Sequence, residues 1–308
     1  MGEPKREEAG LPAHDDAFAE HRPLLFTIAY EMLGGVADAE DVLQESYLRW
    51  SAVDRATVRH PRAYLVRLVT RQALNHLRAL KARREEYVGS WLPEPVRTEP
   101  DVSEDTILAE SVSIAMMLVL ETLNPTERAV FVLHDVFGYT HAEVAASVGR
   151  TEAGVRQICH RAREHVHARR RRFEPDSETS REIARRFLRA ASTGDVRALM
   201  DLMAPDVVAL SDGGGKVSAA RRPVAGRSDV ARFVAGVSRR LPEPSVELAA
   251  YNGLPAVRFL TGGALDWVLA LELRDGRITG LYGIRNPDKL RRADAARPLT
   301  RGGNPWKP

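Results

Sequence analysis

Cysteine is nearly absent from this sequence, because Cys159 is the only one among 308 residues. A single cysteine excludes intramolecular disulfides and any cysteine-based zinc site. Cys159 lies within a helical pattern, where a packed and inert thiol is more common than a redox sensor. We therefore expect Cys159 to be structural, and we expect no metal.

Long apolar runs are missing as well. No stretch approaches the roughly 20 apolar residues that a membrane-spanning helix needs. The polar start MGEPKREEAG also lacks the apolar core of a signal peptide. These absences predict a cytoplasmic protein that makes no contact with a membrane.

A strong excess of one charge is also lacking. The formal net charge is only +3, although the isoelectric point of the sequence is about 9.1. Overall charge is thus a weak argument for nucleic-acid binding, and the distribution of charge along the chain must carry it. A length of 308 residues with 44% hydrophobic residues is sufficient for two or three globular domains.

The most informative pattern spans residues 140–163, THAEVAASVGRTEAGVRQICHRAR. Thr140 and Glu143 have the spacing of a capping box at the start of a helix. Gly149 then supplies a turn residue that tolerates positive φ, and Thr151 can cap a second helix. This order of signals predicts a helix-turn-helix.

The second helix of this unit has a polar and basic outer face. Arginine and glutamine side chains pair with guanine and adenine edges, and an α-helix fits the major groove of DNA. The alternative is a helical hairpin whose basic face is merely solvated. The turn glycine, the apolar spacing and the basic face coincide, which favours DNA binding by Thr151, Arg156, Gln157, His160, Arg161 and Arg163.

The whole chain divides into helical and mixed parts. We expect a disordered tail at residues 1–14, a helical domain at 15–88, an acidic proline-containing linker at 89–105 and a four-helix domain at 106–173. Residues 179–290 then change from helices to strands, with Asn252-Gly253 and Asp275-Gly276 as tight hairpin turns. The predicted fold is two all-α domains followed by an α+β domain with a curved sheet. The basic residues 291–308 are expected to form a disordered tail.

Several motifs resemble a known family. The run from Asp38 to Glu45, DAEDVLQE, resembles the core-binding helix of bacterial sigma factors, and the helix-turn-helix resembles the −35-reading unit of extracytoplasmic-function (ECF) sigma factors. The sequences WLPEP (91–95), DGGGK (212–216) and NPDKL (286–290) resemble the sigma-J-like subgroup with a C-terminal SnoaL-like (NTF2-like) extension. The resemblance covers about residues 15–290.

The resemblance implies roles for particular residues. RNA polymerase core, through the clamp helices of its β′ subunit, would bind Asp38, Asp41, Gln44 and Glu45. The −10 element of promoter DNA would contact Asp54, Arg55, Arg59, Tyr64, Arg67, Arg71, Asn75 and Arg78. Arginines in this set would hold backbone phosphates, and an aromatic ring can stack on an unpaired base. The alternative for both sets is an ordinary solvated helix face.

The extension motifs suggest a regulatory contact. In the resembled family, the linker threads toward the active-site and RNA-exit channels of the polymerase; the alternative is a plain tether. We hypothesise that the C-terminal cone docks on the helical domains and controls them in cis, although a simple turn with a contact lysine is the other reading. The residues concerned are Trp91, Leu92, Pro93, Glu94, Pro95, Asp212, Gly213, Gly214, Gly215, Lys216, Asn286, Pro287, Asp288, Lys289 and Leu290.

An enzymatic alternative stays open. SnoaL-like cones resemble folds of cyclases and ketosteroid isomerases, which use an aspartate base and a tyrosine or acid donor in an apolar pocket. Candidates by residue type are Asp206, Asp212, Asp266, Tyr251 and Tyr282. No spacing selects among them, and fold analogy does not establish activity. We expect a sigma factor without catalysis or cofactor; a DNA-binding regulator with an active cyclase or isomerase domain is the alternative, a repressor is a third class, and a small ligand in the pocket stays open.

Overall fold

The first domain is a three-helix unit. A computed structural model describes residues 14–98, 105–169, 177–240 and 245–302; the predicted tail at 1–13 lies outside them. The domain contains α1 (His14–Leu33), α2 (Val36–Ser51), the 3₁₀ turn η1 (Arg55–Thr57) and α3 (Pro61–Glu85). Leu25, Ile28 and Leu65 are fully buried between the helices. None of the described helices is long and apolar enough to cross a bilayer.

The second domain contains the predicted helix-turn-helix. Its elements are α4 (Thr106–Ser111), α5 (Ile114–Glu121), α6 (Pro125–Phe131), the π-helical turn η3 (Val132–Val136), α7 (His141–Val148) and α8 (Glu152–Arg169). Thr140 and Glu143 form the capping box, and Gly149 ends α7 with φ +68°. The Thr151 hydroxyl accepts the Gly154 N–H at 3.2 Å. The local signals for both helices are confirmed.

The prediction of four helices in this domain was wrong, since residues 106–121 form two helices, α4 and α5. The Ser113 side chain accepts the Met116 N–H and so starts a new helix. The break frees the Val112 carbonyl, which accepts a hydrogen bond from the Asn252 side chain of the third domain at 2.8 Å. A contact from a distant part of the chain thus uses a carbonyl that a continuous helix would have occupied.

The third domain is a six-stranded sheet with helices on one face. Its elements are α9 (Glu178–Thr193), α10 (Val196–Leu202), β1 (Met203–Asp212), β2 (Val224–Ala225), α11 (Arg227–Ser238), β3 (Ser245–Tyr251), β4 (Leu254–Thr261), β5 (Ala264–Arg274), β6 (Arg277–Ile284) and α12 (Pro287–Leu290). The strand order is β2-β1-β6-β5-β4-β3. Asn252 and Asp275 have positive φ in their hairpin turns, as predicted. The parallel pairing of β1 with β6 was not foreseen.

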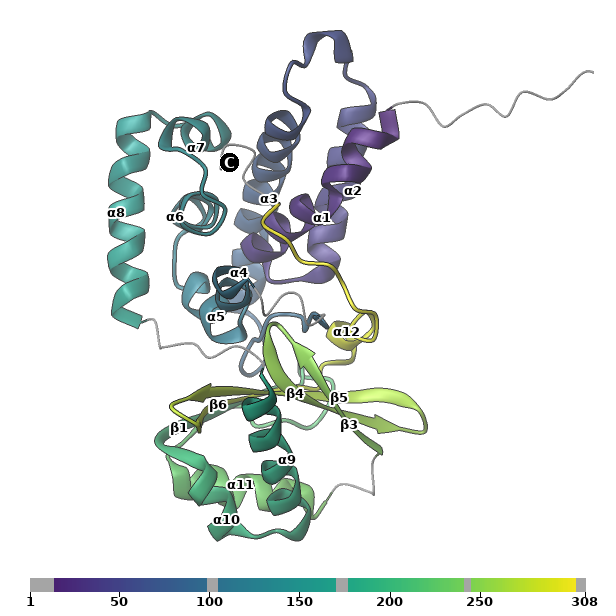
Figure 1. Ribbon diagram of the computed structural model, residues 1–308, viewed down its shortest axis with the longest axis vertical. Coiled ribbons are helices and arrows are strands. Elements are labelled where there is room, and N and C mark those ends of the chain that lie inside the picture. Colours follow the sequence, from purple (N-terminus) through teal and green to yellow (C-terminus); the bar gives the residue numbers. More distant parts are fainter. Residues whose placement is uncertain (1–13, 99–104, 170–176, 241–244, 303–308) are drawn as a thin grey trace, which may run out of the picture.

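The sheet lies between two layers. Helices α9, α10 and α11 cover one face, and the linker with the helical domains lies on the other (Figure 1). Leu92 of the linker and Ile114 of α5 share a buried cluster with Tyr251 and Leu254 of the sheet. The third domain is therefore packed against the helical part of the chain.

The two helical domains also share one core. Buried residues from α1, α3, α6 and α7 belong to a single hydrophobic cluster. At its centre, Arg128 donates from Nε to the Glu31 carbonyl at 2.9 Å. The Glu31 side chain accepts from the Ser111 hydroxyl at 2.9 Å. The interface therefore contains buried polar groups that are largely paired with one another.

The prediction of a disordered C-terminal tail was wrong for residues 291–302, because these residues pack along the helical domains. Leu299 is buried, Arg297 forms an ion pair with Glu40 at 2.6 Å, and Arg301 pairs with Asp105 at 2.6 Å. The Thr300 N–H donates to the Thr27 hydroxyl at 3.1 Å. Basic residues that suggested a solvated tail are thus neutralised by acids of both helical domains. Residues 303–308 lie outside the described part of the chain.

Glu31 gives a pH prediction. Burial raises the pKa of its carboxyl from 4.5 to about 8, against the lowering effects of Ser111 and Arg128. The folded-state pKa is raised, so this contribution to stability is complete below about pH 4.5 and is lost as pH rises through about 8. The free energy of unfolding should therefore differ by on the order of a few kcal/mol between the two ends of this pH range. Glu31→Gln should flatten the pH dependence of urea denaturation between about pH 5 and pH 8; an unchanged profile would show that Glu31 is not the titrating group.

Candidate polymerase, promoter and interdomain sites

The predicted polymerase surface lies on α2. Asp41, Gln44 and Glu45 are exposed, and Arg49 pairs with Glu45 at 2.7 Å and lowers the pKa of that carboxyl. Asp38 is partly buried and contacts His76 of α3 at 3.0 Å. Three of the four residues thus form an open acidic strip, while the fourth also ties α2 to α3.

The predicted −10 residues lie on η1, α3 and the loop that joins them to α2. Most are exposed and available to a ligand: Asp54, Arg59, Arg67, Arg71, Asn75 and Arg78. The side chain of Arg55 lies outside the described part of the structure. Tyr64 is partly buried against Trp50, with ring centroids 5.5 Å apart. A base that stacks on Tyr64 would therefore meet a ring already supported by the core.

The predicted −35 residues lie on or at the start of α8 and are all exposed: Thr151, Arg156, Gln157, His160, Arg161 and Arg163. Several of these side chains have acidic neighbours. Arg156 contacts Glu152 of the same helix, and Arg163 donates to Asp135 at 2.5 Å. Such exposed pairs are weak and can be exchanged for phosphate.

The two predicted DNA-reading units touch each other. Arg71 of α3 donates to the Ala146 carbonyl of α7 at 3.1 Å. Arg71 was expected to hold a DNA phosphate, yet here it holds the first helix of the helix-turn-helix. The −10 and −35 surfaces are therefore fixed within one compact body (Figure 1).

The DGGGK, NPDKL and WLPEP segments meet at one buried carboxylate, that of Asp212. Its Oδ1 accepts from the Tyr87 hydroxyl at 2.5 Å and from the Gly214 N–H at 3.0 Å. Its Oδ2 accepts from the Leu92 N–H at 2.9 Å and from Lys289 Nζ at 2.7 Å. Asp212 is 1% exposed, so these four donors replace the water that an isolated carboxylate would need. We call Asp212, Lys289, Tyr87 and Leu92 the interdomain lock.

Lys289 completes the lock from the other side. Its ammonium also donates to the Leu92 carbonyl. It lies 4.9 Å from the ring centre of Tyr87 and 4.5 Å from that of Trp91. Burial and the hydrogen bond to Asp212 both raise the pKa of the Tyr87 hydroxyl, which stays a donor. The buried cation is thus paired with an anion and enclosed by two aromatic rings.

Glycines allow the close approach of these segments. Gly214 has φ +60°, and a Cβ there would collide with the amide of Asn286. Asn286 in turn caps α12 and donates to the Tyr87 hydroxyl at 2.8 Å. Gly215 has φ +71° and packs on Val88. Only Lys216 of this loop points outward, where it pairs with exposed Asp288.

Glu94 attaches the linker to the first domain. Its carboxylate accepts the N–H groups of Val36 and Ala37 at 2.9 and 3.2 Å, at the electropositive start of α2. Its carbonyl accepts from the Tyr30 hydroxyl at 2.7 Å. Burial raises the pKa of Glu94, and the two N–H donors oppose that shift. In the described residues 89–98 the linker is therefore a packed segment, whereas residues 99–104 lie outside them.

Asn252 is a contact residue that the sequence reading missed. Its amide nitrogen donates to the Tyr30 hydroxyl at 2.7 Å and to the Val112 carbonyl at 2.8 Å. Its side-chain oxygen accepts the Val96 N–H at 3.0 Å. One hairpin turn therefore joins both helical domains and the linker. The Asn-Gly pair was read only as a turn signal, and nothing local distinguishes it from Asp275-Gly276.

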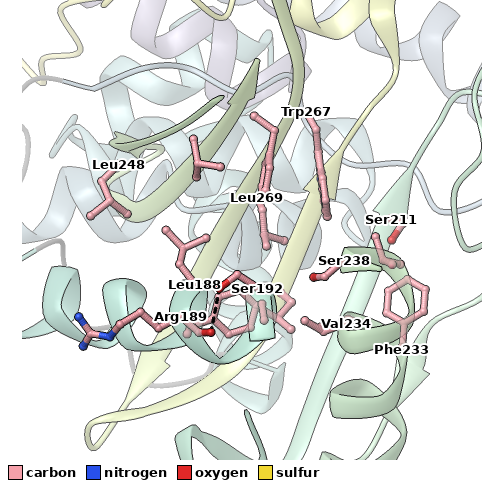
Figure 2. A pocket seen from close by; sticks show the side chains of 18 of the residues that line it. Leu188, Arg189, Ser192, Ser211, Phe233, Val234, Ser238, Leu248, Trp267 and Leu269 are labelled. Atoms are coloured by element: carbon pink, nitrogen blue, oxygen red, sulfur yellow. Dashed lines mark hydrogen bonds between the residues drawn. The ribbon is translucent and has the colours of Figure 1, made fainter. Parts of the chain in front are cut away.

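A cavity of about 700 Å³ lies between the sheet and helices α9 and α11 (Figure 2). Phe187, Phe233, Phe259 and Trp267 give it a mainly apolar lining, together with a few serines and arginines. None of the five candidate catalytic residues is among the side chains that line it. This cavity therefore does not bring together an aspartate base and a tyrosine donor from the five candidates.

The five catalytic candidates are instead dispersed. Asp212 is in the lock, Asp206 faces Arg274 at 3.6 Å, and Asp266 pairs with Arg285 at 3.1 Å. The Tyr251 hydroxyl donates to the Ala293 carbonyl at 2.8 Å, and the Tyr282 hydroxyl donates to Glu272 at 2.6 Å. Each candidate therefore has a structural partner outside the cavity.

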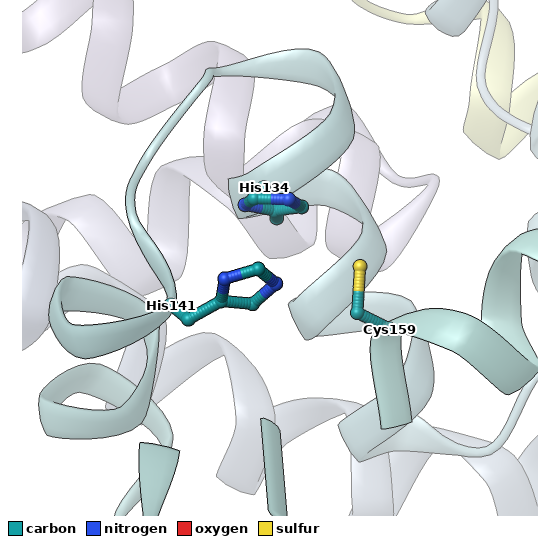
Figure 3. A group of neighbouring side chains, drawn as sticks. All are labelled: His134, His141 and Cys159. Atoms are coloured by element: carbon teal, nitrogen blue, oxygen red, sulfur yellow. The ribbon is translucent and has the colours of Figure 1, made fainter. Parts of the chain in front are cut away.

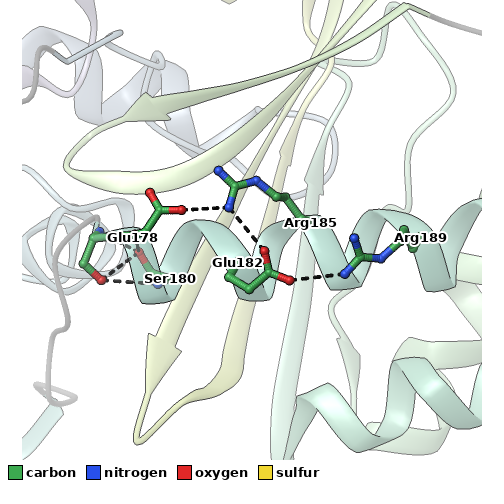
Figure 4. Close-up of polar contacts among 6 residues, drawn as sticks. Glu178, Ser180, Glu182, Arg185 and Arg189 are labelled. Atoms are coloured by element: carbon green, nitrogen blue, oxygen red, sulfur yellow. Dashed lines mark hydrogen bonds and ion pairs between the residues drawn. The ribbon is translucent and has the colours of Figure 1, made fainter.

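The arginines beside the cavity are also partnered. Arg185 of α9 contacts Glu178 at 2.8 Å and Glu182 at 3.2 Å, and Arg189 contacts Glu182 at 3.2 Å (Figure 4). These pairs follow the exposed face of α9. The two cations are consequently balanced without a bound anion.

Comparison with known families assigns all three domains. Residues 17–83 match Sigma-70 region 2, residues 113–166 match Sigma-70 region 4, and residues 184–281 match the SnoaL-like domain.

Whole-chain relatives show the same combination. The ECF RNA polymerase sigma factor SigJ of Mycobacterium tuberculosis is 39% identical over 288 residues, which cover 89% of this chain and 92% of SigJ. A probable ECF RNA polymerase sigma factor of the same species, SigI, is 29% identical over 89% of this chain and 93% of its own. The crystal structure of M. tuberculosis SigJ superposes with a TM-score of 0.73 at 34% sequence identity, and covers 91% of this chain and 99% of that one.

The fold and these matches define a sigma factor with an appended SnoaL-like domain. The chain belongs to the ECF RNA polymerase sigma factors. It is an alternative sigma factor, a protein that directs RNA polymerase core to promoters. The predicted family and fold class are confirmed.

The lock makes a stability prediction. Asp212→Ala leaves the Lys289 ammonium buried without its anion, which typically costs about 3–5 kcal/mol. We expect the free energy of unfolding measured by urea denaturation to fall by this amount. We also expect a larger radius of gyration in small-angle scattering.

Lys216→Ala is the matched control, because it breaks the exposed pair with Asp288. It should cost at most about 1 kcal/mol. Equal effects of the two substitutions would show that the buried pair does not hold the domains together.

Proposed function

We propose that this sigma factor binds core polymerase through the open acidic strip of α2. The strip comprises Asp41, Gln44 and Glu45, all exposed on a helix that the core of the first domain fixes on its other side. A rigid acidic face of this kind complements a basic helical surface and favours fast, specific association. Asp38, which contacts His76 of α3, adds a further carboxylate beside this strip.

We expect Asp41→Arg with Glu45→Arg to reduce binding to core polymerase by at least about 100-fold, because like charges then face each other across the interface. Both residues are exposed, so circular dichroism and thermal unfolding should be unchanged. Binding is measured by titration of labelled chain with purified core polymerase.

Glu178→Arg with Glu182→Arg is the matched control. These residues also stand four apart on an exposed helix face and also pair with an arginine of the same helix (Figure 4). The control should bind core polymerase as the parent chain does. A double reversal on α2 that also binds normally would remove the acidic strip from the proposal.

We further propose that the compact form is held closed by the SnoaL-like domain and that promoter engagement needs it to open. Elements centred at −10 and −35 lie about 25 base pairs apart, which is roughly 85 Å along B-DNA at about 3.4 Å per pair. Helix α3 is only about 37 Å long at 1.5 Å per residue, and α7 packs directly against it through Arg71. The two reading surfaces therefore cannot reach both elements of straight DNA at once.

The observation that carries this proposal is the contact of one domain with both helical domains. Asn252 joins Tyr30 of the first to Val112 of the second. Residues 291–302 add the pairs Arg297–Glu40 and Arg301–Asp105, again one to each side. Separation of the reading units would have to break the contacts of the third domain with at least one helical domain. Those to the first domain include the lock, and those to the second include Asn252–Val112.

In this proposal the third domain controls the helical domains through its contacts with them and catalyses no reaction. The lock consists of side chains of the chain itself, so the control does not require a ligand in the cavity. The five catalytic candidates have structural partners outside the cavity, which also supports control by contact.

Promoter-dependent transcription with purified polymerase tests the proposal. A chain ending after Pro287 loses Lys289 and residues 291–302, and we expect its output to rise several-fold, because closed and open forms near balance shift strongly with a few kcal/mol. A chain ending before Glu174 should give a transcription output different from that of the full chain and from that of the chain ending after Pro287. Its linker has lost the sheet on which Leu92 packs. Unchanged output in both truncated chains would refute control in cis while leaving the sigma-factor assignment intact.

A further inference from the structure

Two histidines lie beside the single cysteine. His134 is in η3, His141 is the first residue of α7, and Cys159 is in α8. A ligand atom from each lies within 4.8 Å of the other two (Figure 3). From the single cysteine we expected no cysteine-based zinc site and no metal. That expectation did not consider histidines that the fold brings beside Cys159.

The hydrogen bonding of His134 orients its ring as in a metal-binding histidine. His134 Nδ1 lies 2.7 Å from the Tyr139 carbonyl, and since a carbonyl only accepts, this nitrogen carries the hydrogen. The Nε2 lone pair is then available, which is how metal-binding histidines are usually oriented by a second partner. The rings of His134 and His141 are stacked, with centroids 4.2 Å apart (Figure 3).

A carboxylate beside Cys159 is the candidate for a fourth ligand, and it lies outside the group formed by the other three. Asp135 Oδ2 is 3.6 Å from Cys159 Sγ, and its Oδ1 is oriented by Arg163 at 2.5 Å. Asp135 follows His134 directly in the π-helical turn, and such turns occur frequently at functional sites. No proline or glycine lies within Val132–Val136 to explain the widened turn.

We propose that His134, His141, Cys159 and Asp135 bind one zinc ion. Two imidazoles, a thiolate and a carboxylate form a tetrahedral set of the kind zinc prefers, with neighbouring ligand atoms about 3.3–3.8 Å apart for bonds of about 2.0–2.3 Å. For His134, His141 and Cys159 a contraction of about 1 Å from the 4.8 Å limit reaches this geometry. Asp135 lies outside that group of three and would have to move further. On binding, the Cys159 S–H proton leaves to solvent as the zinc–sulfur bond forms.

Such an ion would join the three elements that set the geometry of the helix-turn-helix. His141 starts the first helix, Cys159 lies in the second, and His134 and Asp135 belong to the turn before them. The site is independent of the proposed control in cis, because none of its residues touches the interdomain lock.

The test uses the full chain, purified without a polyhistidine tag and stripped of metal by a chelator. Titration with Co²⁺ should give the absorption of a tetrahedral ion with a thiolate-to-cobalt charge-transfer band at one equivalent, and Zn²⁺ should displace it. Cys159→Ser and His141→Gln should each weaken zinc binding by at least about 100-fold, and Asp135→Asn by about 10-fold.

His160→Gln is the matched control, since His160 follows Cys159 directly but is exposed and contacts Glu164. Its affinity for zinc should equal that of the parent chain. Circular dichroism of each metal-free variant shows that its fold is retained, and Cys159→Ala provides a second replacement. The proposal is overturned if cobalt gives an octahedral spectrum without the charge-transfer band, or if Cys159→Ser and Cys159→Ala bind zinc as the parent does.

Discussion

A carboxylate at the end of β1 is the point on which the arrangement of this molecule depends. Asp212 is almost completely withdrawn from water, and an unpaired charge in such a place is strongly unfavourable. Its four partners come from β1's own turn, from the segment after α3, from the linker and from α12. Gly214 and Lys289 belong to the third domain itself, whereas Tyr87 and Leu92 reach the carboxylate only when that domain is docked. Docking therefore completes the set of donors around this charge.

This constraint gives the SnoaL-like domain a structural use unlike that of a pocket enzyme. The face of its sheet opposite α9 and α11 supports the linker, and its Asn252 turn enters the junction of the two helical domains. The apolar cavity lies on the other face of the sheet. The cavity and the lock thus lie on opposite sides of the sheet, and only the lock contacts the segment after α3 and the linker directly.

Local signals were predicted well because their partners are close in sequence. The capping box at Thr140 joins residues three apart, and the Asn252 and Asp275 turns need only their own positive φ. The acidic strip of α2 and the exposed face of α8 follow from helical spacing alone. Motif resemblance then placed DGGGK, NPDKL and WLPEP in one functional group, and the structure brings all three together.

Long-range contacts were predicted poorly. The break between α4 and α5, the packed residues 291–302 and the parallel pairing of β1 with β6 each depend on a partner far along the chain. The same holds for Glu31, whose raised pKa comes from burial at an interface between domains.

The sequence by itself therefore determined the elements, their order and the surfaces they expose, because hydrogen bonds within a turn of helix or a hairpin are decided by neighbouring residues. Only the tertiary structure decided that the two predicted promoter-reading units lie against each other and that a hairpin turn stands between them. The Asn252–Tyr30 contact joins residues 222 positions apart, and a polar side chain finds such a partner only when packing has already brought the two segments together.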